Sequence, residues 1–217
     1  IKAYFEDKLG CKKSSRVIEY GAAFPQDESL SLDLVNEQLS LQLKKNEFHL
    51  VVARLEPENN VALILKGYSS STRFFPLVVV GPTNTLYAQQ LPRSNTQVFY
   101  VGGVYDELLL SSLRLNCRSY WHGHSVGGTN PSLLEAMAHS GVCCVHDNIF
   151  NKHVVGESGF YFSNHEHVDD LFCQLEERMS DAELETKARE AREVVESRFT
   201  WKIIASKYYQ FMMNEQA

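Results

Sequence analysis

Six short apolar runs, each bounded by turn-forming residues, set the strongest limits on the fold of this chain. They are "FHLVVA" (48–53), "PLVVV" (76–80), "VFYV" (98–101), "SYW" (119–121), "VCCV" (142–145) and "FYF" (160–162). Several runs are continuously apolar, which is typical of strands covered on both faces. Segments of helical character separate them, at about 58–70, 84–91, 106–116, 130–139 and 148–155. This alternation predicts an α/β protein with a Rossmann-like, three-layer arrangement, in which helices cover both faces of a parallel sheet.

The C-terminal part of the chain departs from this pattern. Residues 166–213 contain three predicted helices and no strand pattern, so we expect a helical tail after the sheet. Thr200 is predicted to cap the last helix. One face of that helix carries an apolar stripe, formed by Trp201, Ile204, Tyr208 and Phe211.

The N-terminal 47 residues are less regular. "IKAYFEDKLG" (1–10) predicts the end of a helix stopped by Gly10, and "RVIEYG" (16–21) predicts a short strand. Residues 22–31, rich in polar residues and proline, are predicted to be a connector. Because the chain begins at Ile1 in what looks like the middle of a helix, we expect a piece of a longer protein.

Composition argues against several classes of function. The net charge is −6 and the basic residues are scattered, so a nucleic-acid partner is not expected. The five cysteines include no C-x-x-C pair, and we expect packing thiols in a reducing cytoplasm, with no metal site. No apolar run approaches the roughly 20 residues of a membrane-spanning helix. Any anionic ligand must therefore be held by local geometry.

Residues 121–138, "WHGHSVGGTNPSLLEAMA", allow two incompatible interpretations. The first is a G-x-S-x-G elbow that presents Ser125 as a hydrolase nucleophile. An elbow needs a helix that begins at once, which would place Pro131 in its second turn at a cost of about 3 kcal/mol, with about 1 kcal/mol for each glycine. With Asn130 as the N-cap, Pro131 instead takes the first helical position, where it is favoured. The pattern thus favours a loop at Ser125.

The second interpretation is a cradle for an anion at the start of this helix. Gly127 and Gly128 permit close approach of the backbone, and the free N–H groups of residues 130–133 lie at the positive end of the helix dipole. Thr129, Asn130 and Ser132 add neutral donors. The stretch follows the end of a predicted parallel strand, where open α/β sheets bind ligands. Glu135, one turn inside the helix, is either a solvated side chain or an acceptor for sugar hydroxyls.

Arg54 follows the first predicted strand in the same way, before a turn marked by Pro57. An arginine at this point can bind a diphosphate through two parallel hydrogen bonds. Alternatively, it is a surface residue paired with Glu56 or Glu58. Since no G-x-G-x-x-G follows this strand, a nicotinamide or flavin site is not expected.

With Arg54 and "GGTNPSLLEAMA" at two strand ends, the chain resembles the C-terminal, nucleotide-sugar-binding half of retaining family 4 glycosyltransferases, which have the GT-B fold. "ARLEPEN" (53–59) and "HGHSVGGTNPSLLEA" (122–136) are similar to strings in the bacterial rhamnosyltransferase-like subgroup that builds cell-surface polysaccharides. The resemblance runs from residue 16 to the last helix. It implies that residues 1–24 end an N-terminal domain and its connector, that 25–165 form the donor-binding domain, and that 166–217 are helices crossing toward the N-terminal domain.

The resemblance also implies roles for individual residues. Arg54 and Glu135 would form the catalytic pair, with Arg54 on the diphosphate and Glu135 on the ribose. The segment 101–109 would cradle the nucleobase, although its Asp106 is equally well an N-cap for the next helix. The residues expected to bind the donor are Asn59, Gly103, Val104, Tyr105, His124, Ser125, Gly127, Gly128, Thr129, Asn130 and Ser132.

Two positions depart from the family pattern. The first glutamate of its Glu-x7-Glu motif falls on Gly127, and a lysine that normally follows the arginine falls on Asn59. Asn59, His124 or Thr129 could take over the missing contacts, or the donor sugar needs fewer of them, as a 6-deoxy sugar would. For His122 and His124, contact with phosphate and simple packing of the loop both remain open.

The implied reaction transfers a sugar from a dTDP- or UDP-sugar, with dTDP-rhamnose as one candidate, to a glycan or lipid-linked glycan acceptor, without a metal or other cofactor. The chain alone is expected to bind the donor without efficient transfer, since the acceptor side belongs to the missing N-terminal domain. The full-length protein is expected in the cytoplasm or peripherally at the inner membrane face. The alternatives are a GT-B sugar-nucleotide epimerase, a serine hydrolase and a non-catalytic sugar-nucleotide-binding module.

Overall fold

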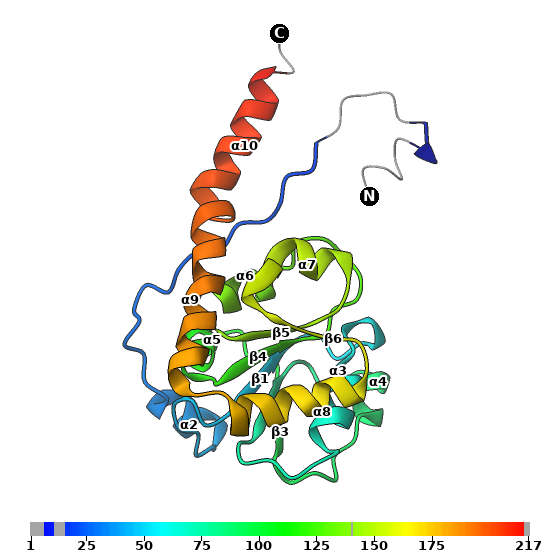
Figure 1. Cartoon of the computed structure of the whole chain (residues 1–217), viewed down its shortest axis with the longest axis vertical. Helices are drawn as coiled ribbons and strands as arrows, with labels where there is room; N and C mark the ends of the chain where they lie inside the picture. The colour runs from blue at the N-terminus through cyan, green and yellow to red at the C-terminus, as the bar shows by residue number, and fades with distance from the viewer. Residues whose placement is uncertain (1–6, 11–15, 140, 215–217) are drawn as a thin grey trace.

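A computed structural model describes residues 7–10, 16–139 and 141–214 of the chain, and it shows a three-layer α/β fold. The six predicted strands are all present and pair in parallel in the order β3-β2-β1-β4-β5-β6 (Figure 1). Their bounds are β1 His49–Val52, β2 Leu77–Val80, β3 Val98–Gly102, β4 Ser119–His122, β5 Cys143–His146 and β6 Phe160–Phe162. The strand order reverses its direction between β1 and β4, so this pair marks the topological switch point.

Nine α-helices are described in these ranges, with short helical turns at Pro57–Asn59, Gly156–Ser158 and Gln174–Arg178. The α-helices are α2 Asp33–Leu39, α3 Val61–Tyr68, α4 Leu86–Gln90, α5 Glu107–Asn116, α6 Pro131–Ala138, α7 Ile149–Val155, α8 His165–Cys173, α9 Asp181–Arg198 and α10 Trp201–Asn214. The five helices predicted between the strands are all confirmed. Asn130 caps α6 by accepting the Ser132 N–H at 2.9 Å, and Pro131 takes the first helical position as expected.

The helices divide between the two faces of the sheet (Figure 1). Alternate residues of each strand enter opposite cores, as Tyr120 and Trp121 do on β4. Helices α2, α5, α6 and α7 pack on one face, and α3, α4 and α8 on the other. Helix α9 contributes to both cores, because its Leu184 lies in the second and its Val195 in the first. Helix α9 therefore packs against both hydrophobic cores, one on each face of the sheet.

A buried polar chain ties the amino ends of the strands to the turn after α8. The indole N–H of Trp121 donates to Ser119 Oγ at 2.9 Å, and Ser119 Oγ lies 2.7 Å from His49 Nδ1. His49 Nε2 lies 2.9 Å from the Glu176 carboxylate, which also accepts the Phe74 N–H. With Ser119 donating to Nδ1 and Nε2–H donating to Glu176, every group in the chain is satisfied. The polar groups at this end of the sheet are thus used in structural hydrogen bonds.

The N-terminal region differs from expectation in two places. Residues 16–21 do not form the predicted strand: only Ala22 is bridged, through its N–H to the Phe199 carbonyl at 2.8 Å. Helix α2 lies where no helix was predicted, because Val35 is its single fully buried side chain and leaves no apolar periodicity. The first predicted helix, at 1–10, lies mostly outside the described residues.

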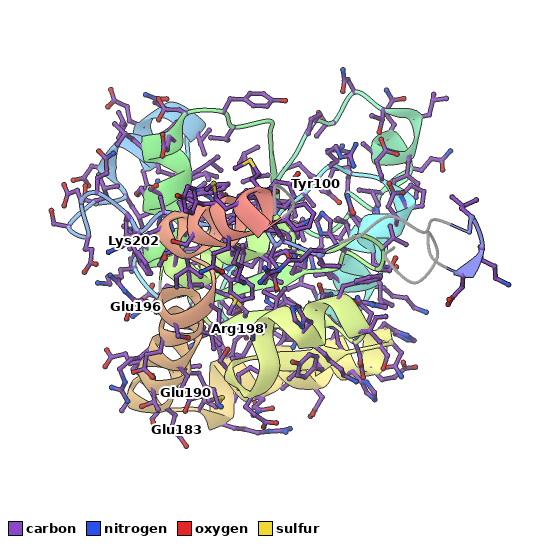
Figure 2. The ribbon with its side chains drawn as sticks, turned by 90° about the horizontal axis from the view of Figure 1, so that it is seen from above. Tyr100, Glu183, Glu190, Glu196, Arg198 and Lys202 are labelled. Atoms are coloured by element: carbon purple, nitrogen blue, oxygen red, sulfur yellow. The ribbon has the colours of Figure 1, made fainter. Side chains whose placement is uncertain are left out.

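Helix α10 extends beyond the sheet layers as a continuation of the α9 column (Figure 1). Viewed from above, Glu183, Glu190 and Glu196 follow α9, and Lys202 marks the start of α10 (Figure 2). Thr200 Oγ1 accepts the Ile203 N–H at 3.3 Å, as predicted for a cap. The apolar stripe of α10 is covered at Ile204 and left half-exposed at Trp201 and Tyr208. No helix in the described residues is both long and apolar enough to cross a membrane.

Candidate donor-binding site

A cavity of about 550 Å³ opens at the carboxyl ends of the central strands. It lies at the switch point between β1 and β4, where parallel sheets of this kind bind ligands. Its walls come from the segments that follow four strands. The lining residues are Val52, Ala53, Arg54, Glu58, Asn59, Val80, Gly81, Pro82, Gly103, Val104, Tyr105, His124, Val126, Asn130 and Ser132. The structure therefore brings together eight of the predicted site residues in one hollow.

Two glycines let the loops around the cavity approach each other closely. A Cβ at Gly81 would lie 2.1 Å from the Ala53 carbonyl oxygen, and a Cβ at Gly123 would lie 2.2 Å from that of Asn59. Both obstacles are main-chain atoms, so no side chain can move aside to make room. Neither contact was predicted, although Gly81 directly follows β2.

Arg54 reaches the cavity from the end of β1 and is exposed. None of the ion pairs within the described ranges includes it, so the predicted alternative of pairing with Glu56 or Glu58 is not seen there. Asn59 is buried, and its side-chain amide donates to the Arg54 carbonyl at 2.8 Å. Asn59 thus fixes the main chain at Arg54 while also lining the cavity.

Ser125 has the geometry of a loop anchor and not of a nucleophile. Both its N–H and its hydroxyl donate to the Glu58 carbonyl at 2.9 Å, and helix α6 begins only at Pro131. A nucleophile elbow requires the helix to follow the serine directly. The structure therefore contradicts the elbow interpretation of residues 121–138, whereas the cradle interpretation stays a prediction.

The predicted cradle is only partly assembled around the cavity. Asn130 and Ser132 line it, whereas the loop of Gly127, Gly128 and Thr129 is not part of its wall. Gly127 has φ of +125°, a conformation that favours glycine, and open space surrounds both glycines. Ser132 Oγ lies 2.8 Å from the Tyr120 hydroxyl, so its position is fixed from the strand beneath.

Glu135 lies one turn inside α6 and forms an ion pair with Arg114 of α5, at 2.6 Å between Oε2 and Nη2. The Arg114 side chain is 6% exposed, whereas that of Glu135 is 42% exposed. Arg114 Nη2 also lies 3.5 Å from Ser132 Oγ. Glu135 is not part of the cavity wall, and its ion pair with the buried Arg114, which was not predicted, holds this expected ribose acceptor in place.

The segment after β3 supplies the far wall of the cavity. Gly103, Val104 and Tyr105 line it, and the Tyr105 side chain is 85% exposed at the rim. Asp106 accepts the N–H groups of Leu108 and Leu109 and caps α5, which confirms the structural alternative for this residue.

His122 and His124 stack face to face, with ring centroids 4.1 Å apart and planes 7° apart. His122 is buried, and its pKa is held well below the usual range by burial and by the neighbouring His124. His124 lines the cavity, and burial followed by the charge of Arg54 lowers its pKa to about 4, against an opposing effect of Glu58. Both rings are consequently neutral near pH 7.

No protein-family model and no curated protein sequence matches the chain. Solved structures are similar in fold: a glycosyltransferase from Rickettsia africae (TM-score 0.79, 13% identity) covers 97% of this chain. Sucrose-phosphate synthase from Thermosynechococcus elongatus has a TM-score of 0.73 and 16% identity and covers 98% of this chain. UDP-forming α,α-trehalose-phosphate synthase from Burkholderia xenovorans has a TM-score of 0.65 and 12% identity and covers 85% of it. The chain spans 60%, 55% and 46% of those chains, respectively. Its architecture is that of the C-terminal half of a GT-B fold with a helical tail.

Proposed function

We propose that this chain is the donor-binding half of a GT-B glycosyltransferase and that its cavity takes a nucleoside diphosphate sugar. The observation that carries the proposal is the convergence of Arg54, the 103–105 segment and the start of α6 on one cavity at the switch point. The similar solved proteins support it, since they include a glycosyltransferase and a UDP-forming synthase.

In the proposed arrangement Arg54 binds the diphosphate, the 103–105 segment binds the base and Glu135 accepts hydrogen bonds from the ribose. Transfer breaks the bond between the anomeric carbon and the diphosphate oxygen and forms a bond from that carbon to an acceptor hydroxyl oxygen, whose proton is released to solvent. Arg54, the amides of the 127–128 loop and the positive end of α6 would stabilise the charge that develops on the departing diphosphate. No metal is required by this scheme.

The finer identity of the donor and acceptor forms part of the same proposal. The strings 53–59 and 122–136 support a place in family 4, in its rhamnosyltransferase-like subgroup, with a dTDP- or UDP-sugar donor and a surface-polysaccharide acceptor. The division at residues 24 and 165, an N-terminal partner domain and a cytoplasmic location go with that assignment. The isolated chain is then expected to bind the donor without efficient transfer.

Calorimetric titration of the chain with dTDP and UDP tests the proposal. The wild type should bind at least one of them, and Arg54→Ala should weaken binding about 10-fold or more, because a charge-assisted contact to phosphate is lost. Glu135→Ala should weaken binding of both nucleotides to a similar degree, since the ribose is common to both.

Asp170→Ala in α8 serves as a control that should leave affinity unchanged, because Asp170 does not line the cavity and, among the described residues, its carboxylate pairs with exposed Arg178. Failure of the wild type to bind either nucleotide, or equal binding by Arg54→Ala, would contradict the assignment of the cavity.

A further inference from the structure

The stacked histidines are a feature that packing alone does not explain. Within the described part of the chain, neither ring nitrogen of His122 has a hydrogen-bond partner, and Nδ1 of His124 is also buried without one. His122 is 1% exposed, and its ring also stacks with that of Tyr120, with 6.1 Å between the centroids. Most buried polar side-chain atoms in proteins have a partner. Two imidazoles beside an anion site therefore call for a role that uses their nitrogens or their charge.

The charged groups around His124 come from several elements. Arg54 at the end of β1 acts against a positive charge on its ring, Glu58 in the turn at 57–59 acts in favour of it, and His122 lies beneath it on β4. At the start of α7, the cap Asn148 and Asn151 donate their neutral side-chain amides to the His124 carbonyl at 2.9 and 3.0 Å. In the free chain, burial of the ring and then the charge of Arg54 keep His124 neutral, against the opposing effect of Glu58.

A diphosphate placed against Arg54 shifts this balance toward the charged form of His124. It compensates the charge of Arg54 and adds an anion close to the His124 ring, and an opposite charge within about 4–6 Å favours the charged form of a side chain. His122 remains neutral beneath, because two stacked cations would repel each other. Its ring face then offers a cation–π contact to the charged ring above. The site would thereby gain the cation that is lacking at Asn59.

Building on the proposed function, we propose that His124 takes up a proton from solvent when the donor or the leaving nucleoside diphosphate binds, and that the resulting imidazolium holds the phosphate. His122 is the neutral stacking partner of this cation. The proton returns to solvent when the nucleotide leaves, so the site is cationic only when it is occupied. Affinity for the diphosphate accordingly rises as the pH falls through the range in which occupied His124 titrates.

Proton counting by calorimetry tests this inference. The chain is titrated with dTDP and with UDP at pH 6.5 and pH 8.0, each in two buffers that differ in ionisation enthalpy, and the difference in observed heat gives the protons taken up. Wild type is compared with His124→Gln, which keeps a hydrogen-bonding side chain that does not titrate. His167→Gln, at an exposed position on α8, is the matched control. The nucleotide's own terminal phosphate has a pKa of about 6, and its contribution cancels when wild type and variant are compared in the same buffer and at the same pH.

We expect the wild type to take up more protons than His124→Gln at pH 6.5 and to bind about 10-fold more tightly, with both differences smaller at pH 8.0. His167→Gln should match the wild type. Equal proton uptake by wild type and His124→Gln would overturn the inference while leaving the proposed function intact. Absence of any binding by the wild type would overturn both.

A variant that does not fold would be recognised by its thermal unfolding. In that case the imidazole 15N shifts of the wild-type chain, recorded with and without nucleotide, replace it. A ring that becomes doubly protonated on binding supports the inference, and a set of histidine shifts that does not change on binding overturns it.

Discussion

Arg114 connects the candidate site to the neighbouring helix through its ion pair with Glu135. Its Nε has no partner in the described residues, and Ser132 Oγ at 3.5 Å is a long contact, so Glu135 provides most of its compensation. Glu135→Ala should therefore lower the free energy of unfolding by about 1–2 kcal/mol, less than for a fully buried pair because Glu135 is partly exposed.

Glu135→Gln should lose clearly less stability than Glu135→Ala, since its amide oxygen still accepts from the guanidinium. Urea denaturation with unchanged m-values measures both. Equal losses in the two variants would show that the carboxylate does not stabilise Arg114. The same measurement shows whether Glu135→Ala is still folded, so that weaker nucleotide binding by this variant is not mistaken for unfolding.

The residues of the site were predictable where one string of sequence carries them. Asn130 and Ser132, which line the cavity, follow from a single helix start, and Arg54 follows from a strand end. The role of Glu135, which is not part of the cavity wall, stays a prediction. Arg114 could not be predicted in this way, because it reaches the site from another helix through tertiary packing. Its sequence signal, a cation in the last turn of α5, equally suits a residue that complements the helix dipole.

At the scale of elements, the approach of the 57–59 turn to the end of β4 depends on Gly123. Gly123→Ala would drive a methyl group against the Asn59 carbonyl, and we expect a loss of about 2–3 kcal/mol in the free energy of unfolding. Gly128→Ala is the matched control, with open space around its Cβ and no positive φ, and should remain within about 1 kcal/mol of wild type. Chemical denaturation compares them, and similar losses in both would contradict the packing argument.

Most strands and helices were predictable because burial of the sheet on both faces requires continuous apolar runs in the sequence of its strands. Successive residues of each strand point into opposite hydrophobic cores, so both must be apolar. On β5, for example, Cys143 lies in one core and Cys144 in the other. The strand predicted at 16–21 was wrong, because Val17 and Tyr20 are 64% and 58% exposed and only Ala22 finds a backbone partner. An exposed connector that contains apolar residues has the same local sequence pattern as a short strand, so the sequence alone cannot distinguish a connector from a strand.

At the scale of the whole molecule, buried histidines should make stability depend on pH. His49, His122 and His139 are nearly inaccessible, and burial lowers the pKa of each, that of His139 to about 4. The unfolded chain therefore binds more protons, so this stability is complete above about pH 6.5 and is lost as the pH falls toward the folded-state pKa values.

His139 should contribute a loss of about 1 kcal/mol between pH 6.5 and pH 5.5, and His49 and His122 add losses of the same sign. Urea unfolding at pH 7.5, 6.5 and 5.5 measures the loss. A free energy of unfolding that stays constant over this interval would mean that the three rings become protonated in the folded chain.

The close contacts of Gly81 and Gly123 decide which residues around the cavity directed evolution can vary: these two glycines must stay, and residues at the rim can change. The main chain sets the shape of the hollow, and a methyl group at either glycine would push its loops apart. At the rim, Tyr105 and Val126 are 85% and 64% exposed and carry no such constraint. A library that randomises these two positions and keeps the glycines should yield folded variants with altered ligand preference.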